Sequence, residues 1–304
     1  MLPSQHASGV SANAALTPMR PGERLGIIAG GGTLPAIIAH EAERLGWRPF
    51  IVAIADGRDA SWDEWESVSL TWGQTGNVFA HLRRRGVSKL VFSGTISVRP
   101  DYRSILPSLQ TLRMLPEILR MTRGGDDSLI RAVAGTFERR GFEVVSVQAI
   151  SPTLLLPAGN LTNRPLSERH HEAIHRAQRA ATRLGLLDIG QAVVASADRV
   201  IALEGIEGTK EMLLRVADLR GRGRIGASEP CVLFKAFKPQ QDARFDLPSI
   251  GTETIRQAQE AGLAGIAMSA NRSLVIEPQR VAEEAEAAGL FVLGIETALG
   301  EDPS

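Results

Sequence analysis

A single cysteine, Cys231, occurs in this sequence of 304 residues, so no disulfide framework can form within the chain. Such scarcity is typical of proteins in a reducing compartment. Because Cys231 belongs to an apolar, strand-like run, we expect an inert buried thiol rather than a nucleophile.

An excess of charge of one sign is also absent. Lys and Arg together number 34, as do Asp and Glu, so no overall field favours a nucleic acid or draws the chain to an anionic membrane. Long apolar runs are missing too: residues 144–163 carry no formal charge, but prolines, asparagines and a glutamine interrupt them. A membrane-spanning segment is therefore disfavoured.

The start of the chain lacks the apolar stretch of a secretory signal and is rich in Ser, Ala and Pro. We interpret residues 1–22 as a disordered extension without chemistry. The remaining length suits two domains, each with its own core. We assign residues 23–152 to the first and residues 167–304 to the second, with a Pro-, Gly- and Asn-rich linker at 153–166.

Short apolar strands alternate with helical periodicity in the first domain. The expected strands are 25–29, 48–54, 89–94 and 142–147, and the expected helices include 34–45 and 77–85. This alternation predicts an α/β fold with a Rossmann-like, mostly parallel sheet.

The second domain reads as a smaller α/β domain of mixed topology. Its expected helices are 167–184, 210–217, 252–261 and 279–288, its expected strands are 231–235, 265–268, 273–276 and 290–294, and its expected hairpin pairs 192–195 with 199–203. Thr252 is expected to cap the third of these helices.

A glycine loop, Gly30-Gly31-Gly32-Thr33, joins the first strand to the first helix. Its backbone N–H groups and the helix N-terminus are suited to a nucleotide or diphosphate, and a tight structural turn is the alternative. Pro35 replaces the third glycine of a dinucleotide fingerprint. A nicotinamide-dependent oxidoreductase therefore remains only an alternative, the more so because Asp56 is not cleanly placed as a ribose partner.

The most informative segment runs from residue 235 to residue 251 and connects a strand to a helix. Lys235, Lys238 and Arg244 are suited to neutralise phosphate oxygens, while Asp242 and Asp246 offer hard ligands for a divalent cation or a base for water. Ligands usually bind at such strand ends in α/β domains. A solvated surface connection is the alternative.

Other polar motifs have structural explanations as well as functional ones. His171 and His175 form H-E-x-x-H, but the surrounding helix is polar on several faces, so we expect a solvated face rather than zinc. Asp126 and Asp127 open a helix, where they cap it or contact a metal or ribose. The segments 188–191 and 207–209 are turn or capping sequences whose polar groups also suit a ligand.

Six segments in one order resemble the LpxI-type UDP-2,3-diacylglucosamine diphosphatases. They are L-G-I-I-A-G-G-G-T-L-P from Leu25, G-D-D-S-L from Gly125, L-D-I-G-Q from Leu187, E-G-T-x-x-M-L from Glu207, K-A-F-K-P-x-Q-D-x-R-F-D-L-P-S-I-G from Lys235 and A-G-L-A-G-I from Ala261. The resemblance extends from about residue 25 to residue 295, and the long charged motif is its most specific part.

The resemblance implies a two-domain enzyme of lipid A biosynthesis with its ligand held between the domains. It implies Mg²⁺-dependent hydrolysis of the pyrophosphate to UMP and 2,3-diacylglucosamine 1-phosphate by water attack on the α-phosphorus. It also implies a homodimer that is cytoplasmic and peripheral at the inner membrane, contacting it through the lipid substrate, with an apolar groove for two acyl chains. A non-catalytic nucleotide-lipid binding protein is a further alternative.

The essential aspartate of the family corresponds to Asp246. We expect Asp246 to bind metal or orient water, Asp242 to assist it, and Lys235, Lys238 and Arg244 to bind phosphate. The expected contacts to the nucleotide or diphosphate are Gly30, Gly31, Gly32, Thr33, Asp126, Asp127, Gln191 and Thr209.

Overall fold

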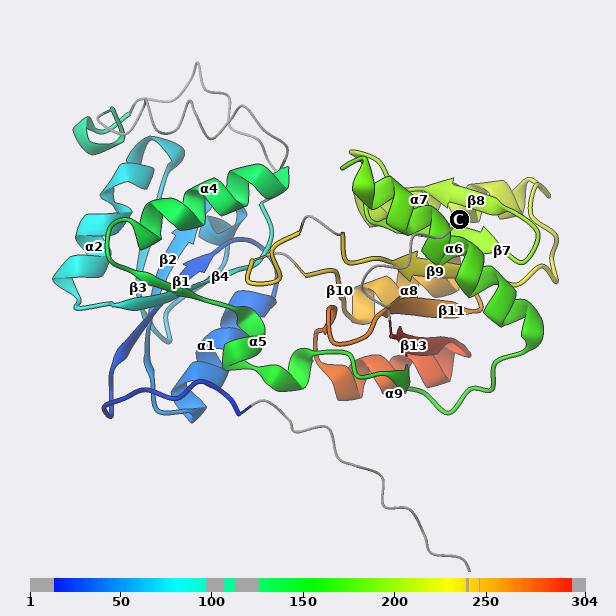
Figure 1. Cartoon of the computed structure of the whole chain (residues 1–304), viewed down its shortest axis with the longest axis horizontal. Helices are drawn as coiled ribbons and strands as arrows, with labels where there is room; N and C mark the ends of the chain where they lie inside the picture. The colour runs from blue at the N-terminus through cyan, green and yellow to red at the C-terminus, as the bar shows by residue number, and fades with distance from the viewer. Residues whose placement is uncertain (1–13, 97–106, 113–125, 239–240, 246, 297–304) are drawn as a thin grey trace, which may run out of the picture. The chain divides into compact units, whose positions relative to one another are not determined.

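The computed structural model of the chain describes residues 14–96, 107–112, 126–238, 241–245 and 247–296. The chain divides into two compact units (Figure 1). Unit 1 comprises Met1–Leu115 and Thr136–Pro152, and unit 2 comprises Pro116–Gly135 and Thr153–Ser304.

Unit 1 is built on a sheet of five parallel strands. Its strands are β1 (Arg24–Ala29), β2 (Arg48–Ile54), β3 (Glu66–Leu70), β4 (Lys89–Ser93) and β5 (Glu143–Val145). Their spatial order is β3-β2-β1-β4-β5, so the direction of winding reverses between β1 and β4, as in doubly wound nucleotide-binding folds. The predicted Rossmann-like sheet is confirmed.

Helices cover both faces of the unit 1 sheet. They are α1 (Leu34–Arg44), α2 (Val78–Arg84) and α5 (Val147–Ile150), with the end of α4 (Asp126–Glu138), which enters unit 1 at Thr136, and the 3₁₀ turns η1 (Ala55–Asp59) and η2 (Trp72–Asn77). Figure 1 shows α1 and α5 on one side of the sheet and α2 on the other. On the latter side the rings of Phe79 and Phe137 lie 4.8 Å apart and those of Phe92 and Phe137 lie 5.4 Å apart, which fixes α2 and the end of α4 against β4.

Unit 2 contains a mixed sheet of six strands, one more than the sheet of unit 1. In spatial order they are β6 (Gly159–Asn160), β13 (Phe291–Ile295), β11 (Gly265–Ser269), β9 (Cys231–Lys235), β7 (Ala192–Ser196) and β8 (Val200–Leu203). The strands β9, β11 and β13 are parallel, and β7 is antiparallel to both β8 and β9. The expected hairpin and the mixed α/β topology are thus confirmed, and the start of β7 lies beside the end of β9.

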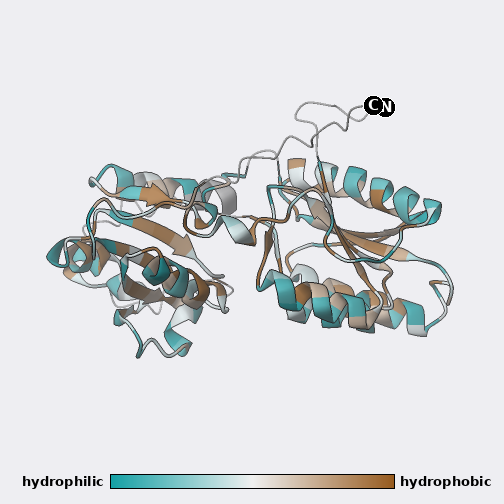
Figure 2. Cartoon of the chain, turned by 90° about the horizontal axis from the view of Figure 1, so that it is seen from below, coloured by the Kyte–Doolittle hydropathy of each residue, from teal (hydrophilic) through white to brown (hydrophobic). Residues whose placement is uncertain are grey.

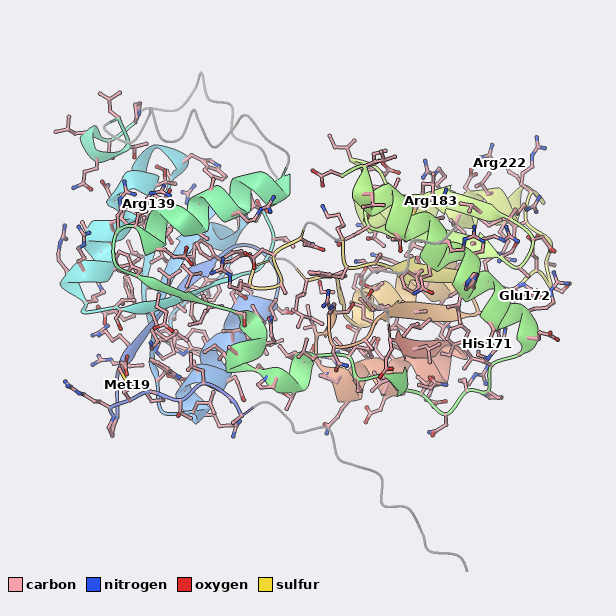
Figure 3. All side chains as sticks on the ribbon, in the orientation of Figure 1. Met19, Arg139, His171, Glu172, Arg183 and Arg222 are labelled. Atoms are coloured by element: carbon pink, nitrogen blue, oxygen red, sulfur yellow. The ribbon has the colours of Figure 1, made fainter. Side chains whose placement is uncertain are left out.

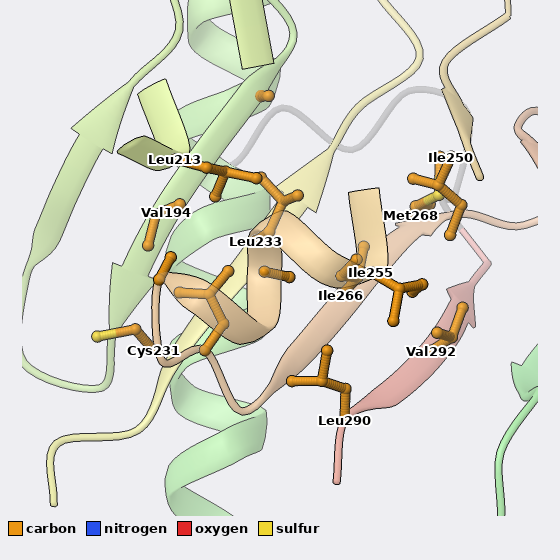
Figure 4. Close-up of a cluster of buried hydrophobic side chains, with 14 of the residues drawn as sticks. Val194, Leu213, Cys231, Leu233, Ile250, Ile255, Ile266, Met268, Leu290 and Val292 are labelled. Atoms are coloured by element: carbon orange, nitrogen blue, oxygen red, sulfur yellow. The ribbon is translucent and has the colours of Figure 1, made fainter. Parts of the chain in front are cut away.

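Alternating side chains of these strands supply two apolar layers. One layer contains Val194, Leu233 and Met268 and packs on α7 (Gly208–Gly221), α8 (Thr252–Glu260) and α9 (Pro278–Ala288) (Figure 4). The other contains Val193, Phe234 and Ala267 and packs on α6 (Glu168–Leu186). This alternation is the period of a strand, and Figure 2 shows hydrophobic strands beneath helices whose outer faces are hydrophilic.

The remaining elements of unit 2 are short. The turn η3 (Pro152–Leu154) leads into it, and β10 (Ser249–Ile250) pairs in parallel with β12 (Leu274–Val275). Among the residues that the structure describes, no helix has both the length and the apolar composition that crossing a bilayer requires.

Three local predictions can be compared with the structure. His171 and His175 are exposed on α6, as the solvated-face interpretation expects, and Figure 3 shows His171 and Glu172 pointing outward. Cys231 is fully buried and burial raises the pKa of its thiol, which fits an inert residue. The expected Thr252 cap is wrong: Gly251 is the N-cap of α8 and no side chain caps the helix.

A tight contact in unit 1 allows a stability test. A Cβ on Gly57 would lie 2.2 Å from the Ala29 carbonyl oxygen and 2.7 Å from the Gly30 carbonyl oxygen. We therefore expect Gly57→Ala to destabilise the protein by about 1–3 kcal/mol, because backbone atoms must move. Gly221→Ala is the control, since open space surrounds Gly221. Thermal unfolding of both variants checks this, and equal melting temperatures would contradict it.

Candidate active site

Polar side chains, of which Glu204, Lys235 and Lys238 are buried, gather at one end of the unit 2 sheet, where β8 and β9 end and β7 begins. We call this cluster the polar edge, and its members are Asp188, Gln191, Glu204, Thr209, Lys235 and Lys238. Hydrogen bonds join the end of β9 to Gln191, Gln191 to Glu204, and Glu204 to Thr209 at the start of α7. The Ala236 N–H donates to the Gln191 carbonyl oxygen at 2.8 Å, and the Gln191 N–H donates to Glu204 Oε2 at 2.9 Å.

Two lysines supply positive charge at the polar edge. Lys235 and Lys238 are each only 8% exposed. Lys235 Nζ donates to the Ser249 carbonyl oxygen at 2.9 Å, and Lys238 Nζ pairs with Asp188 Oδ1 at 2.8 Å. Keeping ammonium groups out of water is costly unless anions or acceptors compensate, so this edge is suited to an anionic ligand.

The backbone around Asp188 explains why this segment has its sequence. Asp188 follows α6 in the left-handed conformation, with φ of 53°, which Asp tolerates better than most residues. The Asp188 N–H donates to the Gly185 carbonyl oxygen and the Ile189 N–H to that of Leu184, which closes the helix end. A Cβ on Gly190 would lie 2.5 Å from the Glu204 carbonyl oxygen, so glycine is required there.

Asp242 and Arg244 form a close pair within the segment that follows β9. Arg244 Nη2 donates to Asp242 Oδ2 at 2.8 Å and its Nε donates to Oδ1 at 3.1 Å. The guanidinium also lies over the Phe245 ring, 4.7 Å from its centre. In this arrangement both carboxylate oxygens of Asp242 accept hydrogen bonds from Arg244, so a metal ion at Asp242 would share these oxygens with the guanidinium.

The pairing fixes the charge of Asp242. The hydrogen bond from Arg244 lowers the pKa of Asp242, although burial opposes this. The pKa of Asp242 is lower in the folded protein than in the unfolded chain, where it is about 3.9. The pairing therefore stabilises the fold at pH values above the unfolded pKa, and this stabilisation is lost as the pH falls through the folded pKa.

Asp242 should therefore not titrate in the working range of an enzyme. From about pH 5 to pH 9 we expect Asp242→Asn to lower kcat/KM without changing the shape of its pH profile. Measured profiles of the two proteins test this. Loss of an acidic limb in the variant would show that Asp242 does titrate there.

The glycine loop of unit 1 lies at the switch point of its sheet. The Gly30 N–H donates to the Ser93 carbonyl oxygen at 2.8 Å and the Gly31 N–H to that of Thr95 at 2.7 Å. The N–H groups of Gly30 and Gly31, which were expected to bind a phosphate, are therefore already hydrogen-bonded within the protein. The N–H groups of Gly32 and Thr33 donate to no acceptor among the described residues, so these two positions keep the capacity to bind an anion.

Close packing also explains part of the glycine loop. A Cβ on Gly30 would lie 2.4 Å from the Thr95 carbonyl oxygen, which supports the structural-turn interpretation at this position. Asp56 lies two residues beyond the end of β2 at Ile54, in the turn η1 that packs against the loop. Asp56 is thus not at the strand end itself.

Some predicted site residues lie outside the described part of the chain. Asp246 is one of them, and the side chains of Asp126 and Asp127, the first residues of α4, are not described either. Gln191 and Thr209 both lie beside Glu204, Lys238 pairs with Asp188, and Lys235 ends the strand that pairs with the start of β7. Among the described residues, no group of three or more His, Cys, Asp or Glu side chains is placed to hold a metal ion.

Sequence reasoning missed Glu204 as a member of this cluster. It follows a strand and precedes Gly205, so a charged residue at a strand end was the available signal. Asp188 was noticed only as part of a turn, and its partner Lys238 lies 50 residues away in the sequence.

A unit with a doubly wound parallel sheet, followed by a unit with a mixed sheet, defines the class of two-unit α/β proteins. Residues 24–154 match the LpxI N-terminal domain and residues 157–293 match the LpxI C-terminal domain. The UDP-2,3-diacylglucosamine pyrophosphatase LpxI of Caulobacter vibrioides is 39% identical over 279 residues, covering 90% of this chain and 98% of the relative. This chain belongs to the LpxI family, and its interpretation as a hydrolase of that family is confirmed.

Proposed function

We propose that the protein hydrolyses the pyrophosphate bond of UDP-2,3-diacylglucosamine in lipid A biosynthesis, releasing UMP and 2,3-diacylglucosamine 1-phosphate. The observation that carries this proposal is the pair of buried lysines at the polar edge, in a chain 39% identical to the Caulobacter pyrophosphatase. Buried ammonium groups are suited to a diphosphate because they neutralise its oxygens without bulk water.

The chemistry assigns a task to each charged residue. Lys235 and Lys238 donate to phosphate oxygens, and Arg244 joins them when it leaves Asp242. Asp246 orients a water and takes its proton while the water oxygen bonds to the α-phosphorus. The bond from that phosphorus to the bridging oxygen breaks at the same centre, and the lipid phosphate leaves.

Mg²⁺ is the proposed cofactor. Mg²⁺ often uses one or two carboxylates and completes its shell with substrate phosphates and water, so Asp242 with Asp246 fits its chemistry. When bound, the ion would add positive charge next to the phosphate oxygens. Chelation with EDTA should abolish turnover and added Mg²⁺ should restore it; unchanged turnover in EDTA would remove the metal from the proposal.

The lipid half of the substrate requires apolar contacts. Exposed apolar side chains occur on the loops that carry the polar edge: Leu187 is 71% exposed, Ile189 53% and Ile206 99%. We propose that they meet acyl chains or the membrane surface, and that the protein acts as a homodimer, as the family resemblance implies. Sedimentation with phospholipid vesicles and size-exclusion chromatography with light scattering test the two points; a protein that stays in the supernatant or elutes as a monomer would contradict them.

The activity assay is direct. Purified protein with Mg²⁺ and UDP-2,3-diacylglucosamine should release UMP, whereas UDP-N-acetylglucosamine, which lacks the acyl chains, should be a poor substrate. Saturable binding of substrate without UMP release would instead indicate a non-catalytic nucleotide-lipid binder. Saturable NAD(H) binding would revive an oxidoreductase.

A further inference from the structure

Glu204 is a buried carboxylate that neutral donors satisfy. It is 8% exposed at the end of β8. Its Oε2 accepts from the N–H groups of Gln191 at 2.9 Å and Ala192 at 3.0 Å, and its Oε1 accepts from Thr209 Oγ1 at 2.6 Å. The described salt bridges include none to Glu204. Burying a carboxylate without a cation is costly unless hydrogen bonds satisfy it, and these three donors do so.

The arrangement fixes the direction of the Thr209 hydrogen bond. A carboxylate only accepts, so the hydroxyl must point its single proton at Glu204. The 2.6 Å separation is within the range of a charge-assisted O–H···O⁻ bond. Toward a ligand, the Thr209 oxygen therefore offers lone pairs and no proton.

Gln191 presents a second acceptor beside the same carboxylate. Its backbone is tied to Glu204, and its side-chain Oε1 is buried without a hydrogen-bond partner among the described residues. An unpaired buried amide oxygen costs free energy until a donor reaches it. Phosphate oxygens of a diphosphate are acceptors themselves, so neither the Thr209 hydroxyl in this orientation nor Gln191 Oε1 matches them, whereas a hydroxyl or N–H donor matches both.

We infer that Glu204 fixes Thr209 as a hydrogen-bond acceptor, so that Thr209 and Gln191 recognise hydroxyl or N–H donors on a ring of the nucleotide sugar and leave its diphosphate to the lysines. This inference rests on the proposed function for the identity of the ligand. Glu204 is a positioning residue in it, whereas Thr209 and Gln191 contact the ligand. The donor groups belong either to the nucleoside or to the glucosamine.

Binding measurements test the inference without turnover, so they stay informative if hydrolysis fails. Calorimetric titrations of the full chain would use UMP, glucosamine 1-phosphate and inorganic pyrophosphate. We expect Thr209→Val to weaken the binding of UMP or of glucosamine 1-phosphate by about 5- to 10-fold, the effect of one lost hydrogen bond, with pyrophosphate affinity unchanged. The affected ligand identifies the ring.

Two further variants separate positioning from folding. Thr209→Ser keeps the hydroxyl and should retain the affinity of the unmodified protein for the ring ligand. Glu204→Gln lets the amide donate to Thr209, which frees the hydroxyl proton; ring binding should fall as in Thr209→Val while pyrophosphate binding holds or rises. If Glu204→Gln lowers only the melting temperature, or if Thr209→Val weakens pyrophosphate as much as either ring ligand, the inference is wrong.

Discussion

Replacing Asp246 with alanine is expected to lower kcat by about 10²- to 10⁴-fold, the contribution of a positioned acid–base group, while the protein stays folded. The residues on both sides of it are anchored: the Phe245 N–H donates to the Asp242 carbonyl oxygen at 3.0 Å, and the Ser249 carbonyl oxygen accepts from Lys235 at 2.9 Å. Because the proposed function assigns Asp246 to the attacking water, its loss is expected to remove chemistry rather than packing. Initial rates of UMP release and the melting temperature of each variant check this.

The controls for Asp246→Ala come from other acids of unit 2. Asp218 is exposed on α7 and pairs with Arg222 one turn away, so Asp218→Ala should leave kcat unchanged. Asp242→Ala should have an intermediate effect because it also frees Arg244. If Asp246→Ala retains more than about a tenth of the original kcat, a different residue handles the water.

Lys238→Met is expected to lower kcat/KM by about 10²-fold, since hydrogen bonds from charged groups are worth roughly 1.5–3 kcal/mol. Lys238 Nζ lies 2.8 Å from Asp188 Oδ1, and the two side chains are 10% and 35% exposed. If the Lys238 ammonium group binds phosphate, the role of Asp188 is only to position that group. Asp188→Asn should then lose far less activity than Lys238→Met.

Comparing Lys238→Met with Asp188→Asn distinguishes phosphate binding by Lys238 from a structural role of the Lys238–Asp188 ion pair. Steady-state kinetics and thermal unfolding are measured on both, with exposed Lys210→Met as the control for loss of a lysine. Parallel losses of activity and melting temperature in Lys238→Met and Asp188→Asn would make the ion pair structural. Phosphate binding would then fall to Lys235 and Arg244.

The sequence predicted elements well where apolar periodicity was strong. The strand expected at 48–54 is β2 with the same bounds, and the hairpin of β7 and β8 was anticipated. The strand β3 was missed because Glu66, Ser67 and Ser69 alternate with few apolar residues and only Leu70 is buried. An edge strand buries one face at most, so its pattern gives little signal.

Candidate site residues could be named from the sequence only where they lie close together in it or carry an obvious charge. Lys235 and Lys238 stand at and just after a strand end, but Asp242 and Arg244 were expected to bind metal and phosphate, and their pairing with each other was not predicted. The ties from Lys238 to Asp188 and from Glu204 to Gln191 join segments 50 and 13 residues apart. These two contacts form because β7 runs antiparallel to β8 and β9, and no local sequence pattern reveals this strand arrangement.

Hydrolysis of UDP-2,3-diacylglucosamine in water enriched with ¹⁸O tests the proposed function most directly, with ³¹P NMR and mass spectrometry of both products. We predict equal amounts of UMP and 2,3-diacylglucosamine 1-phosphate, with one ¹⁸O atom in UMP, because water attacks the α-phosphorus. Label in the lipid phosphate would place the attack on the other phosphorus. Absence of both products with folded protein and Mg²⁺ present would contradict the diphosphatase assignment itself.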